Sequence, residues 1–343
     1  MPSLTDIQLD RAHGTLLGTA VGDALGVPYE FGRRLGPTDI PEMIGGGLGS
    51  YQPGEWSDDT SMAVAIATAA AEGHDLTSDA GLDAVARQFL RWLNDFPGDC
   101  PPDIGNQTYA VLSATRRRLH GDPDAPVGAI MREESLIHAA EHPRSAGNGA
   151  LMRTAPVALA HLDDRTTLAE AARAVAGLTH SDALAGDSCV IWCEAIRVAI
   201  REGRVNIPAG LDLLPSQRRE QWSMWLDEAA TGDPAGFAPN GFTVRALQAA
   251  AAAVLQTPHT SADAHQTLVE SLYTAICIGD DTDTVAAIAG GLLGARWGAS
   301  AVSGTHRDAV HGWPFVDGDA TTYTDLATLT DKALSATAQE VRS

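Results

Sequence analysis

The sequence predicts an all-α protein that folds as a single compact domain of many helices. Apolar residues recur at spacings of three and four along most of the chain, as in helices that bury one face. Alternating runs of β-branched residues, which mark strands, are almost absent, and Pro, Gly and Asp gather between the apolar repeats. Two acidic clusters near opposite ends of the chain, which we expect to meet in one site, favour one domain over two.

The periodicity places the predicted helices in chain order. They lie near residues 8–26, 60–72, 79–94, 106–120, 127–140, 166–178, 184–201, 242–255, 262–277 and 283–297. The proline-containing stretch 203–240 is the only candidate for a domain boundary. We expect instead one domain over residues 1–343, with a core at about 8–300 and a helical extension at 301–343.

Composition and charge exclude several classes of protein. The chain has 343 residues, with 23 Lys and Arg against 44 Asp and Glu, so its formal net charge is −21. Such a surface repels a phosphate backbone, which predicts no general nucleic-acid binding. The longest apolar run, residues 285–295, is shorter than the roughly 20 residues that span a bilayer. The first residues lack the basic and apolar regions of a signal peptide. We therefore expect a cytoplasmic protein without membrane contact.

The four cysteines are too few and too scattered for a disulfide framework. Cys189 and Cys193 lie four residues apart in a predicted helix, a spacing that would suit half of a zinc site. No second Cys/His pair of suitable spacing accompanies them. The pattern favours free, buried thiols at all four positions, the other two being Cys100 and Cys277.

The first predicted helix carries glycine at every fourth residue. Gly14, Gly18, Gly22 and Gly26 fall on one face, and each costs about 1 kcal/mol relative to alanine in a helix. The simplest compensation is another backbone packed against that face. A following proline ends this helix near residue 27, so Glu30 falls on the next loop.

Two acidic clusters each precede an alanine-rich helix. Residues 56–62 are Trp-Ser-Asp-Asp-Thr-Ser-Met, and residues 279–284 are Gly-Asp-Asp-Thr-Asp-Thr. A helix start needs a single cap, so capping explains one aspartate in each cluster and leaves the other unexplained. Carboxylates mixed with hydroxyls suit Mg²⁺, Mn²⁺ or Ca²⁺ and not Zn²⁺. If the clusters converge, their four negative charges would be balanced by two divalent cations.

Two further segments have the character of anion-binding helix starts. Residues 144–153 place small residues around an asparagine before a predicted helix, and residues 102–108 do the same. Backbone N–H groups at a helix start attract phosphate, and two such starts would match a pyrophosphate. Each alone is equally consistent with a plain turn. His180 is either a satisfied polar residue at a helix end or a ligand contact.

In this order the motifs resemble those of the ADP-ribosylglycohydrolase family, over about residues 10–300. The matching segments are Gly-x-x-x-Gly-x-x-x-Gly-Asp-Ala-Leu-Gly-x-Pro-x-Glu, Trp-Ser-Asp-Asp-Thr, Asp-Ile-Gly-Asn, Gly-Asn-Gly-Ala-Leu-Met-Arg, Thr-His-Ser and Asp-Thr-Asp-Thr. The resemblance implies an all-α, single-domain fold with two divalent metal ions, Mg²⁺ or Mn²⁺, at its centre.

The resemblance also implies roles for particular residues. The implied metal ligands are Ser57, Asp58, Asp59, Asp281, Asp283 and Thr284. The implied substrate-binding residues are Gly105, Asn106, Thr108, Ser145, Gly147, Asn148, Gly149, His180 and Phe242, the last near the adenine. Glu30 matches the glutamate of a mobile loop above the site. Ser57 stands where the family usually has threonine, which keeps the hydroxyl and loses the stiffening methyl group.

The implied activity is metal-dependent hydrolysis of the glycosidic bond between ADP-ribose and an acceptor. The acceptor is a modified protein side chain or another ADP-ribosyl conjugate, and the sequence leaves arginine, serine, a nucleic-acid base and a small conjugate open. Either Asp59 or Glu30 would serve as the base that activates water.

Two rival functions remain to be weighed against the hydrolase. A non-catalytic ADP-ribose-binding relative should have lost metal ligands, whereas all six ligand positions keep an oxygen-bearing side chain. A diphosphate enzyme of the terpenoid type would need a third acid after Asp58-Asp59 and an aromatic cavity, and aromatic residues make up only 5% of the chain.

Overall fold

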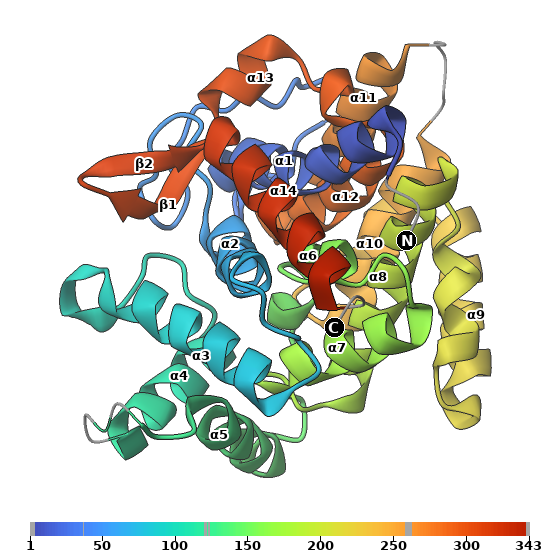
Figure 1. The fold of residues 1–343 in the computed structure, drawn as a ribbon. Helices are drawn as coiled ribbons and strands as arrows, with labels where there is room; N and C mark the ends of the chain where they lie inside the picture. Colours follow the sequence, from blue (N-terminus) through green and yellow to red (C-terminus); the bar gives the residue numbers. More distant parts are fainter. Residues whose placement is uncertain (1–3, 37, 120–121, 123, 258–262, 341–343) are drawn as a thin grey trace.

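The computed structural model describes residues 4–36, 38–119, 122, 124–257 and 263–340. Within them the chain is mostly helical (Figure 1), as predicted. The helices are α1 (Asp6–Gly26), α2 (Asp58–Ala71), α3 (Asp79–Asn94), α4 (Asn106–Leu119), α5 (Val127–Glu141), α6 (Ala155–Ala160), α7 (Arg165–Gly177), α8 (Ala183–Glu202), α9 (Ser216–Thr231), α10 (Thr243–Gln256), α11 (Ala264–Ile278), α12 (Thr282–Trp297), α13 (Gly304–Ala309) and α14 (Tyr323–Glu340). One two-stranded antiparallel sheet is formed by β1 (His311–Val316) and β2 (Asp319–Thr322).

Each helix that the periodicity predicted is present among the described residues, with ends that differ by no more than about two residues, apart from the predicted ends at 120 and 262, which lie outside the described residues. Helix α9 was not predicted, because its sequence is mostly polar and only Trp222, Leu226 and Ala229 are buried on it. It lies inside the stretch considered as a domain boundary. It packs against α10, where Gln248 donates a hydrogen bond to the Trp225 carbonyl at 3.0 Å, so this stretch is part of the same domain.

Helices α1 and α12 pack with their backbones in contact, which confirms the prediction from the glycine spacing. A Cβ atom added at Gly18 would lie 2.1 Å from the Gly290 carbonyl oxygen, and one at Gly22 would lie 2.0 Å from that of Ala286. At the end of the pair, Thr282 Oγ1 donates to the Gly26 carbonyl at 2.8 Å. The contact fixes the end of α1 beside the start of α12, where the second acidic cluster lies.

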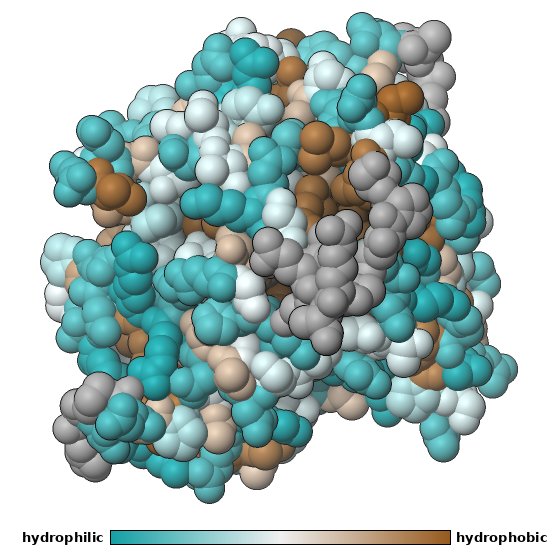
Figure 2. Space-filling model, viewed as in Figure 1, coloured by the Kyte–Doolittle hydropathy of each residue, from teal (hydrophilic) through white to brown (hydrophobic). Residues whose placement is uncertain are grey.

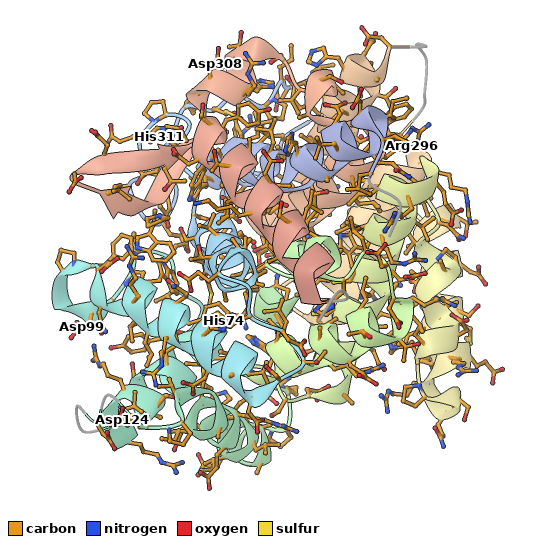
Figure 3. The ribbon with its side chains drawn as sticks, viewed as in Figure 1. His74, Asp99, Asp124, Arg296, Asp308 and His311 are labelled. Atoms are coloured by element: carbon orange, nitrogen blue, oxygen red, sulfur yellow. The ribbon has the colours of Figure 1, made fainter. Side chains whose placement is uncertain are left out.

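The segment after residue 300 was expected to be helical, and it also contains the hairpin of β1 and β2. Helix α14 packs on α1 and α2 (Figure 1). His311, labelled in Figure 3 at the start of β1, exchanges backbone hydrogen bonds with the chain before α2: its carbonyl accepts from Trp56 at 3.0 Å, and its N–H donates to Gly54 at 3.1 Å. The C-terminal segment therefore helps to fix the first acidic cluster.

The face shown in Figure 2 is mainly hydrophilic, with scattered apolar residues. Among the described helices, none has both the length and the hydropathy of a bilayer span. All four cysteines are free, and Cys189 and Cys193 are buried as expected. The expectation of burial is wrong for Cys100, which is exposed on the loop before α4, and only half right for Cys277, which is partly buried.

Candidate active site

The two acidic clusters open into one cavity of about 540 Å³. It lies where the end of α1 and the starts of α2, α4 and α12 come together. Its lining includes most of the residues singled out in the sequence: Glu30, Asp58, Gly105, Asn106, Thr108, Gly147, Asn148, Gly149, His180, Asp281, Asp283 and Thr284. Phe31, Leu48, Asp103, Ile104, Gln107, Met152 and Gly241 complete it.

The start of α2 is capped by a residue of another helix. Asp23 of α1 accepts hydrogen bonds from the backbone N–H of Ser57 at 2.9 Å and of Thr60 at 3.0 Å, and from the Thr60 hydroxyl at 2.6 Å. The Ser57 hydroxyl donates instead to Asp59 Oδ2 at 3.0 Å. Because Asp23 caps the start of α2, neither Asp58 nor Asp59 is needed as a cap. Both carboxylates are therefore available for another role, which explains why the cluster carries two aspartates.

The start of α12 is held by two asparagines. Asn148 Nδ2 donates to Asp281 Oδ2 at 2.7 Å, and the Asp281 N–H donates to Asn240 Oδ1 at 3.0 Å. Asp283 uses one oxygen to accept the Thr284 N–H at 2.9 Å. The loop predicted to bind an anion thus also positions a carboxylate of the second cluster.

Carboxylates of both clusters meet in space. Oxygens of Asp23, Asp59 and Asp283 lie within 4.8 Å of one another, and so do oxygens of Glu30, Asp103 and Asp283. Asp283 belongs to both groups, so five carboxylates from distant parts of the chain form one continuous acidic cluster. The expectation that the two sequence clusters converge is confirmed.

Burial and mutual repulsion raise the pKa values of the carboxyl groups in this cluster. Burial first, and then the neighbouring carboxylates, raise the pKa of Asp58, Asp59 and Asp283 well above the usual range. Burial raises the pKa of Asp23 to about 6, although its hydrogen bonds oppose the shift. Burial, followed by the charge of Asp103, raises the pKa of Glu30 to about 10. Removing protons from these groups requires a compensating positive charge.

The residues present fit a divalent metal ion. Asp59 Oδ1, Glu30 Oε2 and Asp103 Oδ2 are buried oxygens without a hydrogen-bond partner. Carboxylate and hydroxyl oxygens are the donors that Mg²⁺, Mn²⁺ and Ca²⁺ prefer. A cation placed among these oxygens would satisfy them and replace the protons.

Sequence reasoning gave no role to Asp23 or Asp103. Asp23 was visible as an acidic residue on the glycine-rich helix, between Gly22 and Gly26. Asp103 begins the Asp-Ile-Gly-Asn motif, which was considered only as a phosphate loop, and its φ of 70° turns the chain so that its carboxylate meets Glu30. Asp103 could have been identified from the sequence, because it is an acidic residue in a segment already assigned to the site.

The remaining predicted residues surround the cavity without lining it. Ser57 and Asp59 are buried beneath its floor. Ser145 lines an adjoining cavity of about 640 Å³ between α4 and α5, which shares Asn106 and Gln107 with the first. Phe242 is 39% exposed and lies beside Gly147, to which it is joined by a backbone bridge.

Comparisons with known proteins agree with this geometry. The sequence profile described as ADP-ribosylglycohydrolase matches residues 4–342. The ADP-ribosylarginine hydrolase of Pseudomonas putida (strain GB-1) is 30% identical over 292 residues, which cover 85% of this chain and 72% of that protein. The ADP-ribosyl-[dinitrogen reductase] glycohydrolase of Rhodospirillum rubrum is 34% identical over 188 residues, 53% of this chain and 55% of that protein.

A solved structure also matches along nearly the whole chain. It is described as an ADP-ribosylglycohydrolase-related protein complex, with a TM-score of 0.68 and 27% identity, and the match covers 97% of this chain and 100% of that one. The family profile and the structural match both extend over nearly the whole of the chain. The acidic cavity at the ends of α1, α2 and α12 is therefore the site of a protein that belongs to the ADP-ribosylglycohydrolase family.

Proposed function

We propose that this protein is a metal-dependent hydrolase that cleaves the glycosidic bond between ADP-ribose and an acceptor. The observation that carries the proposal is the cluster of buried carboxylates, with three unpartnered oxygens, at the floor of a 540 Å³ cavity. A protein that only binds ADP-ribose has no need of so many buried acids, whose charges are costly to hold without a cation.

Two divalent cations, Mg²⁺ or Mn²⁺, are the proposed cofactors. Their proposed ligands are Ser57, Asp58, Asp59, Asp281, Asp283 and Thr284, which frame the cavity from α2 and α12. When bound, the ions would supply the positive charge that orients the ribose hydroxyls. Asp23 would not need to bind them, because its oxygens already hold the start of α2 in place.

Glu30 is the proposed general base. Cleavage at the anomeric carbon passes through a state with positive charge on the sugar ring, and water must lose a proton as it attacks. Glu30 lines the cavity, whereas Asp59 is fully buried and already accepts from Ser57. Asp103 lies beside Glu30, and carboxylate oxygens of the two residues are within 4.8 Å of one another. Burial first, and then the charge of Asp103, raise the pKa of Glu30 to about 10, so the Glu30 proton would have to be displaced by a bound cation before this carboxylate could accept one from water.

An arginine-linked ADP-ribose is the proposed substrate. Glu30 and Asp103 each have a carboxylate oxygen without a hydrogen-bond partner. Carboxylate oxygens of both residues belong to one acidic group at the cavity. A guanidinium group presents two N–H donors in a fork that matches such a pair of oxygens, and its charge favours an acidic site. A serine-linked conjugate offers no cation there. The similarity to a protein named as an ADP-ribosylarginine hydrolase supports the same choice.

The test is to follow ADP-ribose release from matched peptides modified at arginine or at serine, with Mg²⁺, Mn²⁺ or EDTA. We expect release from the arginine peptide with either metal and little with EDTA. Preference for the serine peptide would refute the assignment of the acceptor. Binding of ADP-ribose without turnover of any conjugate would restore the non-catalytic alternative. A cytoplasmic location and the lack of general nucleic-acid binding stay predictions from composition.

A further inference from the structure

Arg153 is fully buried behind the substrate cavity, and no ion pair involves it within the part of the chain that the structure describes. Its guanidinium lies 4.4 Å above the Phe89 ring, and Nη1 contacts Met62 Sδ at 3.2 Å. Nε has no hydrogen-bond partner, and Nη2 donates to Thr179 Oγ1 at 2.6 Å. Burying a cation without a counterion is costly, and the short hydrogen bond to Thr179 offsets part of that cost.

The Thr179 hydroxyl lies between Arg153 and His180. A guanidinium N–H only donates, so the hydroxyl oxygen accepts from Arg153. Its own proton then needs an acceptor, and His180 Nδ1 lies 2.8 Å away. If Nδ1 carried the proton instead, the hydroxyl proton of Thr179, a fully buried residue, would have no acceptor among the described residues, which is unfavourable. The Thr179 hydroxyl both accepts and donates when the imidazole proton is on Nε2 and leaves Nδ1 as an acceptor.

The Nε2 edge of His180 faces the cavity. A Cβ atom added at Gly149 would lie 3.0 Å from His180 Cε1 and 3.2 Å from Nε2, and one at Gly147 would lie 3.4 Å from Nε2. Glycine at both positions therefore leaves room for the ring edge. Nε2 makes no hydrogen bond to the described residues. Burial first, and then the charge of Arg153, lower the pKa of His180 to about 3, so the ring is neutral at physiological pH.

We propose that Arg153 is a positioning residue that acts through Thr179 to hold His180 as the Nε2–H tautomer, which donates a hydrogen bond to a ligand oxygen in the cavity. The identity of that ligand rests on the proposed function, since ADP-ribose offers phosphate and hydroxyl oxygens. Of the two roles that the sequence left open for His180, this proposal takes the ligand contact. A ring that donates from Nε2 and accepts at Nδ1 has no free lone pair for a metal ion.

The tautomer can be observed in the whole protein without substrate. In protein labelled with ¹⁵N at histidine, the His180 signals are identified by their loss in His180→Gln. We expect the Nδ1 signal of an unprotonated nitrogen and the Nε2 signal of a protonated one at neutral pH. The reverse tautomer, or an imidazolium at neutral pH, would overturn the proposal. The tautomer is measured without turnover, so the result for His180 would hold even if the protein did not hydrolyse any ADP-ribosyl conjugate.

A matched pair of variants tests the route through Thr179. Thr179→Val removes the hydroxyl at nearly constant shape, so both tautomers should become populated. The Kd for ADP-ribose, measured by calorimetry, should then rise about tenfold, as for a weakened hydrogen bond to a charged acceptor. Thr179→Ser keeps the hydroxyl and should retain the wild-type signals and Kd. A purely structural role predicts a lower Tm for Thr179→Val with an unchanged tautomer, and that outcome would refute the proposal.

Discussion

The floor and the mouth of the cavity are built in different ways. Asp283 of α12 lines the floor, Asp23 of α1 and Asp59 of α2 lie beneath it, and all three are almost completely buried. The mouth is formed by the loops that carry Glu30, Phe31 and Leu48, and the last two are more than half exposed. The proposed metal ligands therefore depend on packed helices, whereas Glu30, which is proposed to meet the acceptor, lies on a loop. Variants in the two regions should fail in different ways.

The largest effect is expected from a change beneath the floor. Gly22→Ala places a Cβ 2.0 Å from the Ala286 carbonyl oxygen, so α1 and α12 must separate. We expect the free energy of unfolding to fall by about 3 kcal/mol or more and activity to disappear with the metal site. Chemical denaturation measures the loss. Gly177→Ala is the matched control. A Cβ added at Gly177 meets no atom within 4 Å, so the free energy of unfolding of this variant should hardly change.

Asp283→Asn should abolish turnover while the chain stays folded. The change removes one charge from the residue that belongs to both groups of carboxylates, so metal affinity should fall. Calorimetric titration with Mn²⁺ and the assay of ADP-ribose release measure the two losses, and EDTA should have the same effect on the wild type. Asp308→Asn, on the exposed surface (Figure 3), is the control. Full activity of the chelated enzyme would contradict the assignment of a metal cofactor.

A change at the mouth should slow the reaction and spare binding. Glu30→Gln keeps the shape of the side chain and removes proton transfer, which is worth about 10²–10⁴ in rate. We expect kcat to fall by that factor, while the Kd for ADP-ribose and the Tm stay near their wild-type values. If kcat stayed within about threefold of the wild type, the base would be Asp59.

Metal affinity should increase with pH. The pKa values of Asp58, Asp59 and Asp283 are raised in the metal-free protein, so protons must leave before a cation binds. Below these pKa values affinity should rise about tenfold per pH unit for each proton displaced. Calorimetry in buffers of different ionisation enthalpy measures the protons released. An affinity independent of pH would show that the floor carboxylates are already ionised.

The sequence predicts the helices better than the contacts between them, for physical reasons. Helical periodicity and the spacing of Gly14 to Gly26 are local signals, and they predicted the helices and a backbone packed against the glycine face of α1, but not that this backbone is α12. The capping of α2 by Asp23 depends on packing between two helices, and no local pattern reveals it. The left-handed turn at Asp103 is likewise a tertiary feature. Helix α9 was missed because few of its residues are apolar, and the short hairpin of β1 and β2 offers too few residues for an alternating pattern.

The backbone contact between α1 and α12 has a consequence for biosynthesis. Gly26 and Thr282, which are joined by a hydrogen bond, are separated by 256 residues. A ribosome adds about 5–20 residues per second, so α1 emerges roughly 10–50 seconds before its partner has been translated. During that interval its glycine face has no backbone to pack against. The docking of α12 must therefore wait until most of the chain has been made, and it brings the two halves of the acidic cluster together.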